Sequence, residues 1–346
     1  MDKMNAKLKF TNRTKLMLAY CFSMLGLTLL NILLNVIPNN LSENSLNIMF
    51  SLISQIGCMG IIPFFFAVIF TKKKDKSFAQ AGKELFVSYG YTKKLPSKAW
   101  LLMIPLAISM CLVTQLLSTI SVLFLVAVGF QMPVSAGTIY KGPLDLIRWI
   151  VLSALLPAIF EEFTHRGVAL TALKERGSEM TQVVLSGLLF ALMHTNIMQS
   201  FYAFVGGCIF GYITVRSGSM YPAMILHFTN NAVSCLQSYA MQYPNSALGF
   251  INTINDFWAT NVFTMLLRGV VLVANLFLFI FLLSCFLKFV DKRTPVKGIR
   301  IPKTNIDIDL YHPDGKAMLT DNFIMYGTIA MLSLSTLFSL VWGIIR

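Results

Sequence analysis

Long apolar segments separated by charged loops constrain this chain more than any other feature of its sequence. A helix needs about 20 apolar residues to cross a hydrocarbon core about 30 Å thick. Because charged residues gather between the apolar segments rather than within them, the pattern predicts an all-α, polytopic transmembrane helical bundle with about eight or nine spans. We expect nine spans, at approximately 16–37, 47–70, 100–129, 146–173, 181–197, 200–215, 219–240, 264–287 and 322–345.

The composition agrees with a membrane protein and argues against a nucleic-acid partner. The 346 residues are 56% hydrophobic and 12% charged, which is too apolar for a soluble globule of this length. The net charge of +13 comes mainly from the N-terminal tail and two loops, where it favours retention of these segments in the cytoplasm. The six cysteines fall in apolar spans without a CxxC pair, so we expect neither disulfides nor a thiolate metal site.

The distribution of lysines predicts the orientation. The segment 38–45 has no lysine or arginine, whereas the segment 71–98 is rich in lysine. The alternation places the N-terminus in the cytoplasm, with the plasma membrane as the expected location, and nine spans would leave the C-terminus outside. Because Phe78, Leu85 and Phe86 alternate with the lysines of the 71–98 loop, part of this loop is expected to lie in the membrane interface.

Ionisable residues interrupt the apolar span 146–173 at four positions: Glu161, Glu162, His165 and Arg166. A charge at the centre of a membrane costs at least about 2.5–3.5 kcal/mol, so such residues mark a functional site by default. Glu162 and Arg166 are four residues apart and can form an ion pair. Glu161 has no cationic partner and suits a proton acceptor, although His165 can hydrogen-bond to it. Pro157 can kink the helix before the glutamates and admit water.

Two further spans carry polar residues that complete a hydrolytic set. His194 ends the run Phe190-Ala-Leu-Met-His194, and His227 begins the run His227-Phe-Thr-Asn-Asn231. Four residues separate His227 from Asn231, so both can donate to one oxyanion. A carboxylate, a second histidine and a donor pair are the groups that water-driven amide hydrolysis requires.

Other hydrolytic chemistries have less support in the sequence. No HExxH motif indicates a helical zinc protease, and no GxSxG motif indicates a serine nucleophile. Glu162-x-x-His165 has the spacing of half a di-iron site, but no second copy follows. Glu161, His194 and His227 form a ligand set that zinc accepts. Spacing alone leaves both a zinc site and a metal-free glutamate mechanism open.

These motifs resemble those of the CPBP family, which comprises CAAX proteases and bacteriocin-processing enzymes and is also called the Abi family. The resemblance rests on Glu161-Glu162-x-x-x-Arg166, Phe190-x-x-x-His194 and His227-x-x-x-Asn231, in this order, with support from the segment 206–222. It divides the chain into N-terminal spans with a basic cytoplasmic loop, a protease-like core, and C-terminal spans with a second basic loop, at 1–142, 143–240 and 241–346.

The resemblance implies a bundle of about eight spans around a water-accessible conical cavity, which opens toward the cytosol in the best-known relatives. By this analogy Glu161 and His194 activate water, and His227 and Asn231 hold the oxyanion. Glu162 and Arg166 brace the site. The family is commonly labelled as metalloproteases and a metal-free mechanism is also argued, so the cofactor stays open between zinc and none.

Two features of the sequence depart from the family pattern, and the expected membrane depths of the site residues are a third difficulty. His165 occupies a position where the family usually has an aromatic or apolar residue, and the C-terminal extension lies outside the match. The expected span boundaries also place Glu161 near mid-membrane, His194 toward the outer end of its span and His227 toward the inner end. Kinked or shifted helices are therefore required to bring the three together.

The leading functional hypothesis is an intramembrane endopeptidase that hydrolyses membrane-embedded or lipid-anchored peptides. Prenylated CAAX substrates are implied by the family name alone. One alternative is a non-catalytic membrane scaffold or bacteriocin self-immunity protein that uses the same polar core. A proton-coupled transporter with Glu161 and His194 as a relay has less support, because it does not need the pair His227 and Asn231.

Overall fold

The computed structural model describes residues 12–36, 42–132, 138–174, 178–291 and 319–345, and every regular element in these segments is helical. The elements from the N-terminus to the end of the segment that carries the two glutamates are α1 (Asn12–Val36), α2 (Glu43–Leu52), the π-helical segment η1 (Ile53–Ile61), α3 (Ile62–Thr71), α4 (Phe78–Ser88), α5 (Ser97–Ala127), α6 (Pro143–Ile150), the π-helical segment η2 (Val151–Leu155), α7 (Leu156–Glu162), the π-helical segment η3 (Phe163–Ala169) and α8 (Leu170–Ala172). The remaining helices are α9 (Glu179–Met193), α10 (Ile197–Ser217), α11 (Tyr221–Gln242), α12 (Phe250–Ala259), α13 (Val262–Val290) and α14 (Leu319–Ile345).

Seven helical segments within the described residues are long and apolar enough to cross a membrane. They correspond to α1, α2 through α3, α5, α6 through α8, α10, α13 and α14. Many of their large apolar side chains are exposed at the bundle surface, as lipid contact requires. The chain is therefore an integral membrane protein, and the predicted all-α transmembrane bundle is confirmed.

Two of the nine expected spans are not among these seven segments. The expected span 181–197 is the helix α9, which ends at Met193 and has 15 residues, too few to cross the bilayer alone. The expected span 219–240 is α11, which has 22 residues but falls outside the seven apolar segments. Its polar residues include His227, Asn230 and Asn231, and they lower its hydropathy. Both helices instead pack inside the bundle and carry candidate site residues.

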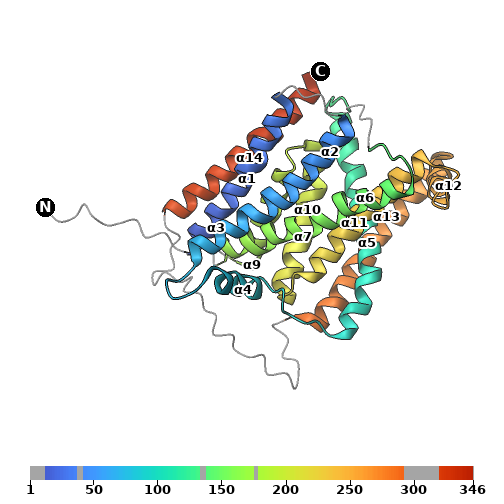
Figure 1. Ribbon diagram of the computed structural model, residues 1–346. Helices are drawn as coiled ribbons and strands as arrows, with labels where there is room; N and C mark the ends of the chain where they lie inside the picture. Colours follow the sequence, from blue (N-terminus) through green and yellow to red (C-terminus); the bar gives the residue numbers. More distant parts are fainter. Residues whose placement is uncertain (1–11, 37–41, 133–137, 175–177, 292–318, 346) are drawn as a thin grey trace.

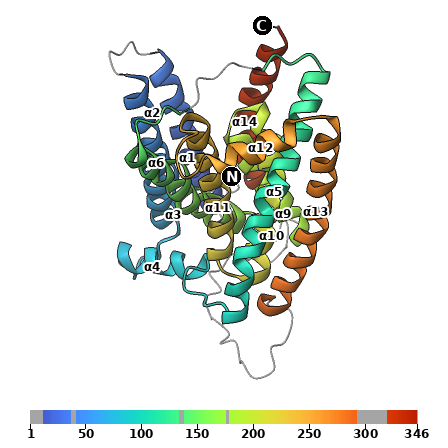
Figure 2. The ribbon, with the colours of Figure 1, turned by 90° about the vertical axis from the view of Figure 1, so that its right-hand side faces the viewer.

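The helices form a bundle in which short central helices are flanked by longer ones (Figures 1 and 2). Helix α1 packs against α3 and α14 on one flank, and α5 packs against α13 on the other. The central helices α7, α9, α10 and α11 lie between these flanks. The candidate residues of the sequence therefore lie in the middle of the molecule.

Glycine allows α9 and α10 to pack unusually closely. A Cβ atom at Gly187 of α9 would lie 2.5 Å from Cys208 Sγ and 2.9 Å from the Cys208 nitrogen of α10. A Cβ atom at Gly207 would lie 3.0 Å from the Gly187 Cα. Small residues are the usual device for such close helix approach in membranes. The contact brings the Gly207 backbone near the centre of the bundle.

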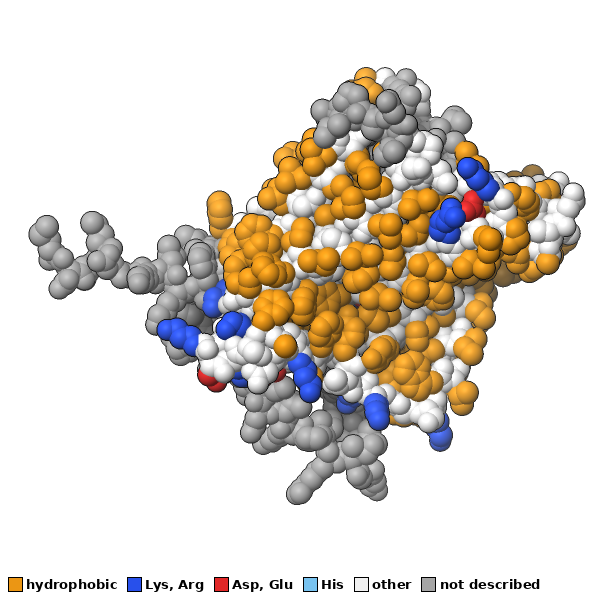
Figure 3. Space-filling view, viewed as in Figure 1, with side chains coloured by type: hydrophobic (Ala, Val, Ile, Leu, Met, Phe, Trp, Pro, Cys, Tyr) orange, Lys and Arg blue, Asp and Glu red, His pale blue; other side chains and the backbone are white. Residues whose placement is uncertain are grey.

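One end of the bundle, hereafter the basic end, joins the ends of several helices through polar contacts. Arg216 at the end of α10 pairs with Asp291 after α13. The Tyr221 hydroxyl donates to the Tyr91 carbonyl at 2.7 Å, and Ser219 Oγ donates to the Lys93 carbonyl at 3.3 Å. The short helix α4 lies at this end, and lysine and arginine side chains gather along it in Figure 3.

The other end, hereafter the opposite end, has its own set of contacts. The Gln131 backbone after α5 donates to the Gly343 carbonyl of α14 at 2.8 Å. The Tyr140 backbone before α6 donates to Gln242 Oε1 at 3.0 Å, and Asn252 Nδ2 donates to the Ala240 carbonyl at 2.6 Å. When α9 and α11 are counted, consecutive long helices run antiparallel between the two ends.

Helix α4 forms the part of the 71–98 loop that was expected at the membrane interface. Ser77 and Gln80 form a capping box that fixes its first turn. Leu85 is buried against the bundle, whereas Phe78 and Phe86 are 41% and 39% exposed. This amphipathic helix supports the expectation of an interfacial segment.

Candidate active site

The helix that carries the two glutamates is widened by π-helical turns on both sides of them. The turn η2 precedes Leu156 and Pro157, and the Leu156 nitrogen donates to the carbonyl five residues back, at Val151. A second π-helical stretch, η3, follows Glu162. Pro157 lacks the N–H of a normal helical turn, and a π-turn accommodates that gap. Such turns occur often at functional sites.

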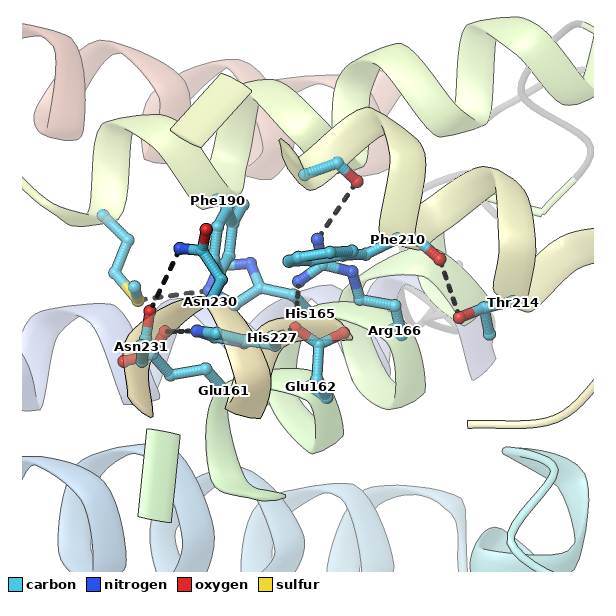
Figure 4. Close-up of polar contacts among 12 residues, drawn as sticks. Glu161, Glu162, His165, Arg166, Phe190, Phe210, Thr214, His227, Asn230 and Asn231 are labelled. Atoms are coloured by element: carbon cyan, nitrogen blue, oxygen red, sulfur yellow. Dashed lines mark hydrogen bonds and ion pairs between the residues drawn. The ribbon is translucent and has the colours of Figure 1, made fainter. Parts of the chain in front are cut away.

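Glu162 and Arg166 form the predicted ion pair, with 3.1 Å between Glu162 Oε1 and Arg166 Nη1. Both side chains are fully buried. Arg166 Nη2 donates to the Gly207 carbonyl at 3.0 Å, and its guanidinium lies 4.4 Å from the centroid of the Phe190 ring. Figure 4 shows Arg166 between Glu162 and the ring of Phe210. These contacts compensate the buried cation with a charge, a carbonyl and aromatic faces.

His227 lies between the two glutamates. Its Nδ1 is 2.8 Å from Glu162 Oε1, and its Nε2 is 3.8 Å from Glu161 Oε2. The rings of Phe190 and Phe210 pack against the imidazole, with centroid separations of 5.6 and 5.5 Å. The ring is thereby fixed with one nitrogen toward the buried ion pair and the other toward Glu161.

Glu161 has a different environment from its neighbour. Gln55 Nε2, in the π-helical turn η1, donates to Glu161 Oε1 at 2.8 Å. Glu161 also lines a cavity of about 750 Å³, whereas Glu162 does not. Gln55 was missed by the sequence analysis. Its signal was available, because an amide inside the apolar span 47–70 needs a partner in the bundle interior.

His194 reaches the same cavity from the end of α9. Its Nδ1 lies 2.9 Å from the Phe190 carbonyl, and its ring packs edge-on against the Phe190 ring. The next residue, Thr195, has a positive φ of 50°, which turns the chain sharply toward α10. A β-branched residue is strained in this conformation. The short helix α9 and this turn place His194 on the wall of the cavity that Glu161 and His227 also line, although the expected spans put the three residues at different membrane depths.

Asn231 lies on the cavity wall one turn beyond His227. Asn230 Nδ2 donates to Asn231 Oδ1 at 3.5 Å, which is a long hydrogen bond. This contact uses the oxygen of the Asn231 amide, so the NH2 group of Asn231 can donate to another acceptor. The cavity therefore gathers Glu161, His194, His227 and Asn231 from three separate segments. Figure 4 shows Glu161, His227 and Asn231 side by side.

His165 does not hydrogen-bond to Glu161, contrary to the sequence expectation. Its ring is fully buried among Tyr20 and Phe190, and its Nε2 lies 3.2 Å from Met193 Sδ. Four-residue spacing allowed a contact with Glu161, but the His165 ring packs against Tyr20, Phe190 and Met193 instead. The residue packs where an aromatic ring would fit.

The candidate zinc ligands do not form a ligand group in this arrangement. Across the described residues, no three or more His, Cys, Asp or Glu side chains are arranged to hold a metal ion. Glu161 and His227 are 3.8 Å apart, and His194 Nδ1 is directed at a backbone carbonyl.

The cavity wall mixes polar and apolar side chains and carries few ionisable groups. Among the described residues that line it, Glu161 is the sole Asp or Glu, and no lysine or arginine is present. Tyr140 also lines the cavity and donates to the Cys235 carbonyl at 3.2 Å. Burial raises the pKa of Tyr140 to about 12, so its hydroxyl stays protonated near neutral pH.

Comparison with known families agrees with the site. Residues 143–233, about a quarter of the chain, match the family described as type II CAAX prenyl endopeptidase Rce1-like. No curated protein and no solved structure matches the chain. The matched segment contains all six residues that the sequence nominated, namely Glu161, Glu162, Arg166, His194, His227 and Asn231. The segment that builds the central cavity is therefore similar to the Rce1-like type II CAAX prenyl endopeptidase family.

Proposed function

We propose that the protein is an intramembrane endopeptidase that hydrolyses membrane-associated peptides with water activated by Glu161. The observation that carries this proposal is the difference between the surroundings of Glu161 and those of Glu162. Glu161 faces the cavity with a neutral amide as its hydrogen-bond partner, 3.8 Å from His227, while Glu162 is held by Arg166. A carboxylate that is close to an imidazole and reachable by water suits general-base catalysis.

In the first step of the proposed reaction, water is the nucleophile and Glu161 is the general base. A water molecule beside Glu161 attacks the scissile carbonyl carbon, and Glu161 accepts one of its protons. The carbon–oxygen double bond becomes a single bond, which leaves a tetrahedral intermediate with negative charge on oxygen. His194 lines the same cavity and is placed to help orient the water. Positioned proton transfer of this kind contributes about 10²–10⁴-fold to a rate.

His227 and Asn231 are the proposed donors to the oxyanion. His227 Nδ1 lies 2.8 Å from Glu162 Oε1, and an Nε2–H of the same ring, on the side of Glu161 and the cavity, is the proposed first donor. The Asn231 NH2 group supplies a second donor. When the intermediate collapses, the carbon–nitrogen bond breaks and Glu161 returns its proton to the leaving amine. Glu162 and Arg166 act as positioning residues for His227.

The proposal is tested by peptide cleavage with detergent-purified protein. The substrates are a panel of quenched fluorescent peptides, with and without a lipid anchor, and the enzymes are wild type, Glu161→Gln and His227→Ala. Arg148→Ala serves as the matched control, because Arg148 is half exposed and pairs with Asp145 away from the cavity. We expect cleavage by wild type and Arg148→Ala only.

The opposite result would support a non-catalytic protein. If wild type cleaves no peptide in the panel and Glu161→Gln sustains the cellular phenotype of the gene, the catalytic proposal is wrong. A membrane scaffold that uses the same buried polar core would then account for the site. Thermal unfolding of each variant distinguishes lost chemistry from lost folding.

A further inference from the structure

The cavity extends from the middle of the bundle toward the opposite end. Helix α5 runs from the basic end to the opposite end, and it contributes residues between Met110 and Thr119, from its middle onward. Helix α10 runs the other way and contributes residues between Gln199 and Phe210, from its first turns to just past its middle. Helix α11 contributes the residues from His227 to Ser238, again toward the opposite end.

A layer of buried side chains closes the cavity toward the basic end. Glu162 and Arg166 are 0% and 2% exposed, and Phe190 and Phe210 are each 4% exposed. Arg166 also lines a separate pocket at the basic end, together with Tyr89 and Arg216. The ion pair and its aromatic partners therefore separate the two hollows, and Glu161 is reached from the opposite end.

The charge distribution assigns the two ends to the two sides of the membrane. The opposite end carries Lys141, Arg148 and Arg268 among the described residues, and Arg148 is paired with Asp145. The basic end carries the following lysines and arginines: Arg13, Lys15, Lys72, Lys73, Lys74, Lys76, Lys83, Lys93, Lys94, Lys98, Lys174, Arg216 and Lys288. Loops rich in lysine and arginine stay in the cytoplasm. The mouth of the cavity then faces away from the cytoplasm.

The lining of the cavity indicates what it accepts. Helix α5 presents Thr114, Gln115 and Ser118 to the cavity, and α11 presents Asn230 and Ser238. These neutral donors and acceptors match the N–H and C=O groups of an extended peptide. A prenyl chain packed against them would displace their water without replacing its hydrogen bonds, which is unfavourable. The wall therefore suits peptide backbone better than an isoprenoid.

We propose that the substrate is a peptide segment without a prenyl group that enters the cavity from the outer side of the membrane. Substrates of this class are membrane-associated polypeptides that expose a peptide segment on the outer side of the membrane. This proposal rests on the proposed peptidase function for cleavage, but the side of access is independent of catalysis. It differs from the cytosolic opening that the family resemblance implies.

The side of access is tested by thiol labelling in intact cells. All six native cysteines are first replaced by alanine, because Cys111 and Cys235 themselves line the cavity. Single cysteines are then introduced as Ser118→Cys or Ser238→Cys in the cavity and as Lys73→Cys at the basic end. A membrane-impermeant maleimide should label both cavity variants without permeabilisation and label Lys73→Cys only after it. Labelling of Lys73→Cys alone in intact cells would overturn the proposal.

The substrate class is tested with paired peptides of one sequence, either unmodified or carrying an S-farnesyl cysteine. We expect purified wild-type protein to cleave the unmodified peptide at least about tenfold faster. Faster cleavage of the farnesylated peptide refutes the proposed substrate class while it supports the peptidase. If neither peptide is cleaved in any sequence tested, the peptidase function and the substrate class both fail, and the labelling result still decides the side of access.

Discussion

The two neighbouring glutamates of α7 define two regions of one site, a bracing side and a cavity side. On the bracing side, Glu162 is fully buried and contacts Arg166 and His227. On the cavity side, Glu161 contacts Gln55 and lies beside open space. Successive residues of a helix point about 100° apart, so adjacent identical residues enter different surroundings. The comparison shows that residue type and spacing in the sequence can mark a carboxylate as a candidate site residue, while the side chains around it decide its role.

The two sides also differ in how charge is compensated. Arg166 neutralises Glu162 inside the protein, and removal of either partner would leave an isolated buried charge. Gln55 gives Glu161 a hydrogen bond without neutralising it. We therefore expect substitutions on the bracing side to lower stability first, and substitutions on the cavity side to lower activity first. Four predictions follow from the largest expected effect to the smallest.

Glu161→Gln should lower the rate of peptide cleavage by about 10²–10⁴-fold, because the amide cannot accept a proton from water. The change preserves size and the contact with Gln55, so the thermal unfolding midpoint should stay near that of wild type. Steady-state cleavage and thermal unfolding of the purified protein measure the two effects. A variant that retains wild-type activity would place the general base elsewhere.

Arg166→Met should lower the free energy of unfolding by about 3–5 kcal/mol, because Glu162 is then a buried charge without its counter-ion. The measurement is unfolding in detergent, with Arg148→Ala as a surface control that should change by about 1 kcal/mol or less. The double variant Glu162→Gln with Arg166→Met should recover part of the loss. A loss as small as that of the control would remove the bracing role.

Asn231→Ala should lower kcat by about 10²–10³-fold while KM changes little, because a donor to the oxyanion acts mainly in the transition state. The neighbouring variant Asn230→Ala is the matched control and should have a smaller effect, since Asn230 acts only through its 3.5 Å contact with Asn231. The kinetic constants of both variants on one peptide decide the matter. A KM effect without a kcat effect would make Asn231 a substrate-binding residue instead.

Gln55→Ala should lower kcat by about 10–100-fold, because a hydrogen bond to a charged group contributes about 1.5–3 kcal/mol and here fixes Glu161. Gln115→Ala is the matched control, since Gln115 is a second glutamine that lines the same cavity, from α5. Gln55→Glu should be at least as harmful, because a second carboxylate would repel Glu161. Activity equal to the control would show that Glu161 needs no positioning by Gln55.

The site was predicted from sequence to different degrees in its different parts. The pair Glu162 and Arg166 follows from helical spacing and is confirmed in the structure. The same spacing gives no contact between Glu161 and His165, whose ring packs against Tyr20 and Phe190 instead. Helical spacing limits which side chains can meet, and tertiary packing decides which contact forms.

The number of membrane-crossing helices shows the same limit. Within the described residues, seven helical segments were recognisable as spans from length and hydropathy. Helices α9 and α11 are not among these seven, because one is short and the other carries several polar residues. Both pack against several other helices in the centre of the bundle. Hydropathy reports the contact with lipid and says less about helices enclosed by protein.

The sequence by itself determined that the chain is an all-helical membrane protein, because only helices can satisfy so many backbone groups in lipid when the apolar runs are this long. It also nominated the polar residues, because charges inside apolar spans are costly. Only the tertiary structure decided that Glu161 faces a cavity, that Gln55 supports it and that the zinc ligand set is not assembled. These features depend on contacts between residues far apart in the chain, such as Gln55 and Glu161, which local spacing does not encode.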